Sequence, residues 1–138
     1  MIEIKIQNNE SRSLASMKDQ NGNLYKAPIF MDQEDIRGKV FINLYKGKNV
    51  EHSSIRIECI GVIEHLMDSS RNLTFLQLWK DVEPPGNLYE NSDYDFQFPK
   101  CELLHESYNG GIVRVRYYIN VVINRSYGKI IKEAEFVV

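Results

Sequence analysis

The segment 111-GIVRVRYYINVVIN-124 decides the fold, because it continues from Gly111 to Asn124 without a proline or an interior glycine. Its apolar positions alternate with mostly polar ones: one set is Val113, Val115, Tyr117, Ile119, Val121 and Ile123, and the other is Arg114, Arg116, Tyr118, Asn120 and Asn124. This period of two predicts a β-strand with one face in a core and the other in water. At about 3.3 Å per residue the strand is about 40 Å long, about twice the usual length, so we expect it to span a whole sandwich.

Further segments alternate in the same way or are rich in β-branched and aromatic residues. They are residues 2–6, 14–18, 23–29, 36–44, 55–65, 72–80, 94–98 and 129–138. Asn21-Gly22 predicts a hairpin between the second and third of these. No segment shows an apolar stripe at helical spacing, so we expect an all-β antiparallel sandwich in which Tyr117, Ile119 and Val121 pack against Ile57 and Phe96.

Composition excludes several classes of protein. The 138 residues suit one domain, and a formal charge of -2 argues against nucleic acid as a partner, because backbone phosphates require a basic stripe. The first ten residues lack the basic and apolar regions of a signal peptide, and no apolar run approaches about 18 residues, so we expect a cytoplasmic location. Cys59 and Cys101 are expected to be separate, unpaired thiols.

No catalytic or metal-binding constellation can be recognised. His52, His65 and His105 lie far apart without matching cysteine or carboxylate spacing. Asp93 and Asp95 share one strand face, which allows a catalytic carboxylate pair but fits a solvated outer face better. Since no phosphate-binding loop, dinucleotide fingerprint or nucleophile elbow is present either, we expect no enzyme activity, no cofactor and no metal.

Two surface features allow alternative interpretations. Arg114, Arg116 and Tyr118 could stack on single-stranded nucleic acid, but cross-strand ion pairs with acids such as Glu133 or Glu135 agree better with the net charge. Trp79 could anchor a partner, and the simpler expectation is a half-buried core residue. From the residues alone, we expect a non-catalytic β-sandwich that acts by binding a partner.

Four stretches together resemble a known family. They are 38-GKV-40, 51-EHSSIRIECIGVIE-64, 85-PGNLYENSDYDFQFP-99 and 106-ESYNGGIVRVRYYINVVI-123. Their order and spacing resemble the N-terminal lobe of the arrestin-fold subunit of retromer, the endosomal sorting coat, over nearly the whole chain. More distantly, the chain is similar to the retriever counterpart of that subunit and to the arrestins.

The resemblance implies an immunoglobulin-like antiparallel β-sandwich of arrestin type, forming a single lobe over residues 1–138. It also implies a non-catalytic adaptor that helps to retrieve transmembrane cargo. The implied partners are the α-solenoid scaffold subunit of retromer, sorting nexins and cargo tails. The implied location is cytoplasmic and peripheral on endosomal membranes, with membrane association indirect through the complex.

Two further expectations come from the same resemblance. Family members carry a second, C-terminal lobe that holds most of the scaffold-docking surface, and this chain stops before it. Asp32, in the acidic loop 32-DQED-35, matches an acid that meets the β-hairpin of a PDZ-containing sorting nexin. The alternative for Asp32 is a solvated charge at a turn. The alternatives for the whole chain are a generic immunoglobulin-like recognition module outside trafficking and a retriever- or arrestin-type adaptor.

Overall fold

The computed structural model describes residues 1–6, 13–18, 22–99, 101–103 and 105–138. Apart from one short 3-10 turn, η1 (Ser69–Arg71), the regular structure there is β-strand, which confirms the all-β prediction. In chain order the strands are β1 (Ile2–Ile6), β2 (Leu14–Lys18), β3 (Leu24–Pro28), β4 (Ile36–Ile42), β5 (Val50–His52), β6 (Ser54–His65), β7 (Leu73–Glu83), β8 (Gly86–Leu88), β9 (Ser92–Phe98), β10 (Tyr108–Asn109), β11 (Val113–Arg125) and β12 (Gly128–Phe136).

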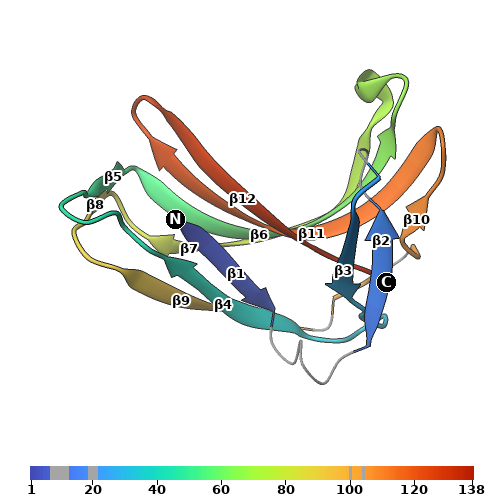
Figure 1. The fold of residues 1–138 in the computed structure, drawn as a ribbon, viewed down its shortest axis with the longest axis horizontal. Coiled ribbons are helices and arrows are strands. Elements are labelled where there is room, and N and C mark those ends of the chain that lie inside the picture. Colours follow the sequence, from blue (N-terminus) through green and yellow to red (C-terminus); the bar gives the residue numbers. More distant parts are fainter. Residues whose placement is uncertain (7–12, 19–21, 100, 104) are drawn as a thin grey trace.

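The large sheet is built around β11, which forms as the sequence predicts. β11 pairs with β6 along one side, and with β10 and then β12 along the other, while β7 adds to the far side of β6. All these pairs are antiparallel. The sheet bends strongly, so that its convex side faces β1, β4 and β9 and its concave side faces away from them (Figure 1).

The second sheet is small and consists of β1, β4 and β9, with β4 in the middle, also antiparallel. Val40, in the middle of β4, is paired with Ile4 on one side and Tyr94 on the other. Inward-facing Val40 and Ile42 are fully buried, whereas Lys39, the neighbour of Val40, is charged and faces outward. In β4, successive side chains therefore face the core and the solvent in turn, as the alternating sequence predicts.

The core lies between the convex side of the large sheet and the small sheet. Tyr117, Ile119 and Val121 from β11, Ile57 from β6 and Phe96 from β9 are all buried in one cluster, as predicted. The aromatic contacts continue the cluster, because the Phe30 and Tyr117 rings both pack on Phe136, at centroid distances of 5.2 and 5.5 Å. The antiparallel sandwich is confirmed.

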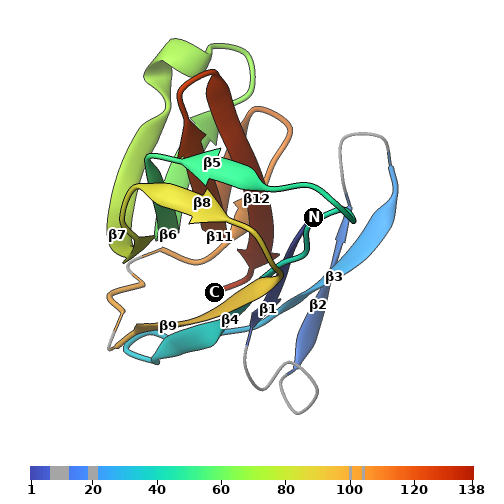
Figure 2. The same ribbon diagram turned by 90° about the vertical axis from the view of Figure 1, so that its left-hand side faces the viewer.

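The predicted hairpin between β2 and β3 is also present and stands beside the two sheets (Figures 1 and 2). Asn21 at its expected tip lies outside the described residues, while Gly22 has a φ of 83°, a conformation that glycine adopts easily. After β3, Ile29 forms a parallel bridge to Val137, and Phe30 N–H donates to the Val137 carbonyl. The hairpin is thereby joined to the end of the chain.

Three short strands are missing from the sequence prediction. β5 and β8 pair with each other across one end of the large sheet (Figure 2), and β10 pairs with the start of β11. Strand bounds also differ by a few residues, since β4 ends at Ile42 and β7 continues to Glu83. Neither difference alters the architecture.

Candidate protein-binding site

The acidic loop that precedes β4 is a well-bonded turn. Its backbone pairs with the segment after β9: Gln33 N–H donates to the Cys101 carbonyl at 2.9 Å, and Cys101 N–H donates to the Glu34 carbonyl at 3.2 Å. Met31 N–H donates to Glu34 Oε1 at 2.8 Å, and Gln33 takes up a positive φ of 68°. The loop is therefore held as a defined surface rather than a free connection.

Asp32 lies exposed on this loop and has a local structural role. Its Oδ1 accepts the backbone N–H of Leu103 at 2.8 Å and lies 3.4 Å from Gln33 Nε2. Leu103 itself is buried in the core. The simple expectation of a solvated charge at a turn is thus incomplete, because one carboxylate oxygen holds the segment after β9 in place. No hydrogen bond or ion pair of Oδ2 is found among the described residues.

More negative charge lies close to Asp32. Asp35 is 3.4 Å from Arg37 and 3.4 Å from Gln97 Nε2, so part of its charge is compensated. Asp32 forms no such ion pair within the described ranges. The loop therefore presents Asp32 as a fixed acid beside the exposed side chain of Met31. Such a surface suits a partner that carries a donor or a positive charge.

Asp93 and Asp95 do lie together, as the sequence predicts, but on an outer face and around a cation. Lys39 Nζ is 3.4 Å from Asp93 and 3.6 Å from Asp95. The charge of Asp95 first, and the hydrogen bond and charge of Asp93 next, raise the pKa of Lys39 above its ordinary value. The two carboxylates form a surface ion-pair cluster, and nothing in its geometry activates a nucleophile or a water.

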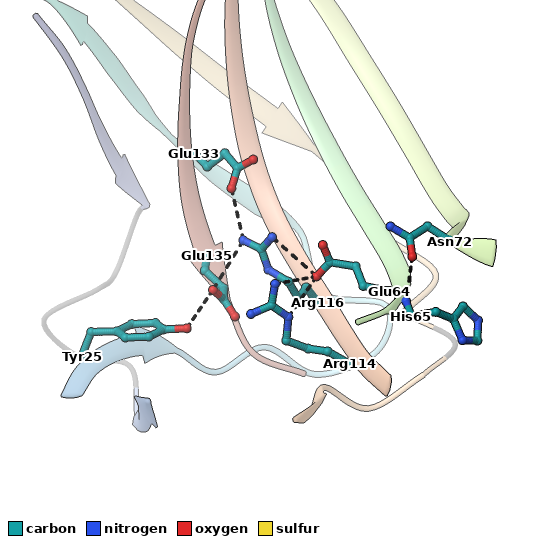
Figure 3. Close-up of polar contacts among 8 residues, drawn as sticks. All are labelled: Tyr25, Glu64, His65, Asn72, Arg114, Arg116, Glu133 and Glu135. Atoms are coloured by element: carbon teal, nitrogen blue, oxygen red, sulfur yellow. Dashed lines mark hydrogen bonds and ion pairs between the residues drawn. The ribbon is translucent and has the colours of Figure 1, made fainter. Parts of the chain in front are cut away.

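Arg114 and Arg116 of β11 form ion pairs within the protein (Figure 3). Arg114 lies 2.8 Å from Glu64 on β6, and Arg116 lies 3.1 Å from Glu133 and 3.7 Å from Glu135 on β12. Cross-strand pairing is therefore confirmed as the better interpretation. Because these guanidinium groups are already neutralised, they do not form a free basic stripe for nucleic acid.

The network extends to the hairpin through Tyr25. Its hydroxyl donates to Glu135 Oε2 at 2.9 Å, joining β3 to β12 (Figure 3). Burial, the hydrogen bond to Glu135 and the charge of Glu135 together raise the pKa of Tyr25 to about 12. Burial lowers the pKa of Arg116, but the carboxylates of Glu135, Glu133 and Glu64 outweigh that effect and raise it overall. Sequence reasoning misses Tyr25, since nothing local marks it.

Trp79 is not the half-buried core residue that the sequence suggests. Its side chain is 56 % exposed on β7, which is the edge strand of the large sheet, and Arg56 lies over its ring at 5.5 Å. The flanking residues Leu76 and Leu78 pack against the core instead. The prediction fails because the alternation of β7 turns Trp79 to the opposite face.

The histidines and cysteines end in different environments. His52 is buried, His65 is half-buried and His105 is exposed, and no group of three or more His, Cys, Asp or Glu side chains within the described ranges is arranged to hold a metal. Cys59 and Cys101 are both free and buried, as unpaired thiols. They are not separate, however, because the interaction with the Cys101 thiol, followed by burial, raises the pKa of Cys59, while Cys101 Sγ itself donates to the Phe98 carbonyl at 3.1 Å.

Together these features define an antiparallel β-sandwich of arrestin type, with an ordered acidic loop and with internally paired surface charges. The family model described as Vacuolar protein sorting-associated protein 26 matches residues 1–138. The chain belongs to this family. The expected family is therefore confirmed.

Individual relatives agree with this assignment. The chain is 38% identical to Vacuolar protein sorting-associated protein 26B of Arabidopsis thaliana, over 99% of this chain and 46% of the relative. It is 40% identical to Vacuolar protein sorting-associated protein 26 of Plasmodium falciparum (isolate 3D7), with the same two coverages. It is 35% identical to protein 26B-A of Xenopus laevis, over 99% of this chain and 41% of the relative. The chain thus spans about half the length of the curated relatives it matches.

Within the described ranges, no helix is long and apolar enough to cross a bilayer.

Proposed function

We propose that this chain is a non-catalytic adaptor lobe of a retromer-type endosomal sorting complex, which acts by protein–protein binding in the retrieval of transmembrane cargo. The observation that carries the proposal is the family match over all 138 residues. The arrestin-type β-sandwich agrees with it, and the ion pairs of Lys39, Arg114 and Arg116 with acids of neighbouring strands are typical of a stable sheet surface. Association with endosomal membranes is then indirect, through the complex.

The proposed contact for a sorting nexin is the loop around Asp32. The loop is fixed by backbone hydrogen bonds to Cys101 and by the bond from the Leu103 N–H to the Asp32 carboxylate, so little conformational entropy is lost when a partner binds. Asp32 keeps one carboxylate oxygen for a partner while the other holds Leu103. A β-hairpin of a PDZ-containing sorting nexin that offers a donor or a cation at this point is the partner that we propose.

The scaffold subunit is a second proposed partner. Since the chain spans about half of its relatives, we propose that the main scaffold-docking surface lies outside these residues, on a second lobe. Cargo tails are proposed to bind near the junction of the two lobes.

An affinity capture experiment tests the proposed function. The tagged chain should retain purified retromer scaffold subunit or a PDZ-containing sorting nexin, measured by quantitative mass spectrometry. A generic recognition module outside trafficking would retain neither at a level above an unrelated β-sandwich of similar charge. That result would overturn the proposal.

A further inference from the structure

The concave face of the large sheet carries a row of four side chains that the proposed function does not use. In the strand registers, Trp79 of β7 pairs with Glu58 of β6, Glu58 pairs with Asn120 of β11, and Asn120 pairs with Glu133 of β12. All four point away from the core, because their neighbours Ile57, Cys59 and Ile119 are buried on the other face. No described element packs over the middle of this face (Figure 1).

The first feature that suggests a ligand is the side-chain amide of Asn120. This residue is only 9 % exposed, and its Nδ2 donates to Glu58 Oε1 at 3.2 Å. Its Oδ1 is buried and has no hydrogen-bond partner within the described part of the chain. Buried carbonyl oxygens are almost always paired in native proteins, so this acceptor is a candidate for a donor that arrives with a partner.

The second feature is the carboxylate of Glu58. The neighbouring acids of the same face have cations: Glu133 lies 3.1 Å from Arg116, and Asp81 lies 2.9 Å from Arg56. Glu58 forms no ion pair with any residue in the described ranges, and its one hydrogen bond comes from the neutral amide of Asn120. The charge of Glu58 acts on Arg56 of the same strand, but Arg56 donates its hydrogen bond to Asp81. Within the described residues, the middle of the row therefore holds a carboxylate and a carbonyl oxygen that have no positively charged hydrogen-bond donor.

Trp79 completes the arrangement next to Glu58. Its indole is more than half exposed, although Arg56 lies over the ring at 5.5 Å. Tyr118, on the same face of β11, lies under the Arg116 guanidinium at 4.9 Å. Aromatic faces beside carboxylates bind cations, and exposed tryptophans are enriched at binding hot spots.

We propose that this concave face binds an extended segment of a partner protein by taking up an arginine side chain between Trp79, Glu58 and Asn120. A guanidinium matches the site better than an ammonium, because its planar fork of five donors can serve the carboxylate and the carbonyl together while it stacks on an aromatic ring. We choose this occupant by charge complementarity, since among the described residues of the row Glu58 is an anion without an ion pair and the Asn120 carbonyl has no hydrogen-bond donor. This inference does not depend on the Asp32 loop or on a role in sorting.

Trp79 makes the test direct, because it is the single tryptophan of the chain. Its fluorescence is followed during titration with a blocked peptide of alternating arginine and threonine, in which every second side chain falls on one face of an extended segment. Matched peptides with glutamine or glutamate in place of arginine are titrated at the same ionic strength. We expect a saturable change with the arginine peptide and none with the other two.

Two variants and a control locate the binding. Glu58→Gln keeps the shape of the side chain and should weaken binding about tenfold, which corresponds to about 1.4 kcal/mol. Asn120→Leu removes the unpaired acceptor at similar volume and should also weaken binding about tenfold. Glu3→Gln removes the same charge from the outer face of the small sheet and should change nothing.

Several outcomes overturn the proposal. One is the absence of a saturable change, and another is equal binding of the glutamate peptide. Unchanged affinity in Glu58→Gln places the peptide elsewhere, even if Asn120→Leu does not fold. A Trp79 signal that depends on protein concentration without peptide assigns the face to a second copy of the chain instead.

Discussion

Asp32 has a role in the fold and, in the function that we propose, a second role toward a partner. Its Oδ1 holds the Leu103 backbone, 71 residues away in the sequence, and its charge points into solvent. The two roles can be separated, because asparagine keeps a carbonyl acceptor but has no charge. Alanine and arginine remove both the acceptor and the negative charge.

The prediction for stability follows from this separation. Asp32→Ala should lower the free energy of unfolding by about 1 kcal/mol, since the Leu103 N–H loses its partner. Asp32→Asn should stay within about 0.5 kcal/mol of the wild type. Urea unfolding followed by circular dichroism measures both. Equal stability of all three proteins would mean that the bond to Leu103 contributes nothing in solution.

Tyr117, inside the core, also combines two structural roles. Its hydroxyl donates to the His105 carbonyl at 2.6 Å and accepts the His105 N–H at 3.2 Å, while its ring packs on Phe75 and Phe136. One residue of β11 thus fixes the segment that leads into β10.

Two substitutions at Tyr117 should therefore differ in cost. Tyr117→Ala should cost about 3 to 5 kcal/mol, because a fully buried ring is lost. Tyr117→Phe should cost about 1 kcal/mol through the two hydrogen bonds alone. Tyr127→Phe, at a position 70 % exposed, is the control. Denaturant unfolding of the three variants checks the order, and equal destabilisation by the phenylalanine and the alanine substitutions of Tyr117 would contradict it.

Among the strands, length decides which ones the sequence predicts. β11 and β6 could be predicted because twelve or more alternating residues establish a period. β5, β8 and β10 could not, because two or three residues are too few. Trp79 is misassigned from sequence, since a strand's period does not say which face is the core. The contact between Cys59 and Cys101 depends on tertiary packing.

The attachment of the β2–β3 hairpin gives a pH prediction. The pKa of Tyr25 is raised in the folded state to about 12, so the folded protein holds this proton more tightly than the unfolded chain. The contribution of Tyr25 to stability is therefore complete below its ordinary pKa of about 10 and is lost as the pH rises toward 12.

Comparison with Tyr25→Phe isolates this effect. Tyr94 also has its pKa raised to about 12, so both proteins should lose stability at high pH. The wild type should lose more than Tyr25→Phe between pH 10 and 12, as measured by urea unfolding across that range. Parallel curves would show that the bond from Tyr25 to Glu135 does not form in solution.

At the scale of the whole molecule, the sandwich and the family could both be predicted, because the alternating pattern and the spacing of four stretches extend over the chain. The surfaces could not, since they depend on which strands become neighbours. Asp32 is found by resemblance, whereas its bond to Leu103 and the row from Trp79 to Glu133 depend on registers that no local pattern encodes.

The proposed division between two lobes predicts a difference in scaffold affinity. The 138-residue chain should bind the α-solenoid scaffold subunit at least about tenfold more weakly than a relative of about twice its length does, equivalent to about 1.4 kcal/mol. Calorimetric titration with both proteins measures this. Equal affinities would place the main scaffold surface on the present chain.

A calorimetric titration with the PDZ domain of a cognate sorting nexin tests most directly whether this chain is a sorting adaptor with a binding loop at Asp32. The wild type should bind. Asp32→Arg should bind at least about thirtyfold more weakly, since losing one partner of a desolvated charge pair costs about 2 to 5 kcal/mol. Asp32→Asn, which keeps the bond to Leu103, should also bind more weakly although its stability is unchanged. Wild-type affinity in both variants, or no binding by the wild type, would show that Asp32 does not form the proposed sorting-nexin contact.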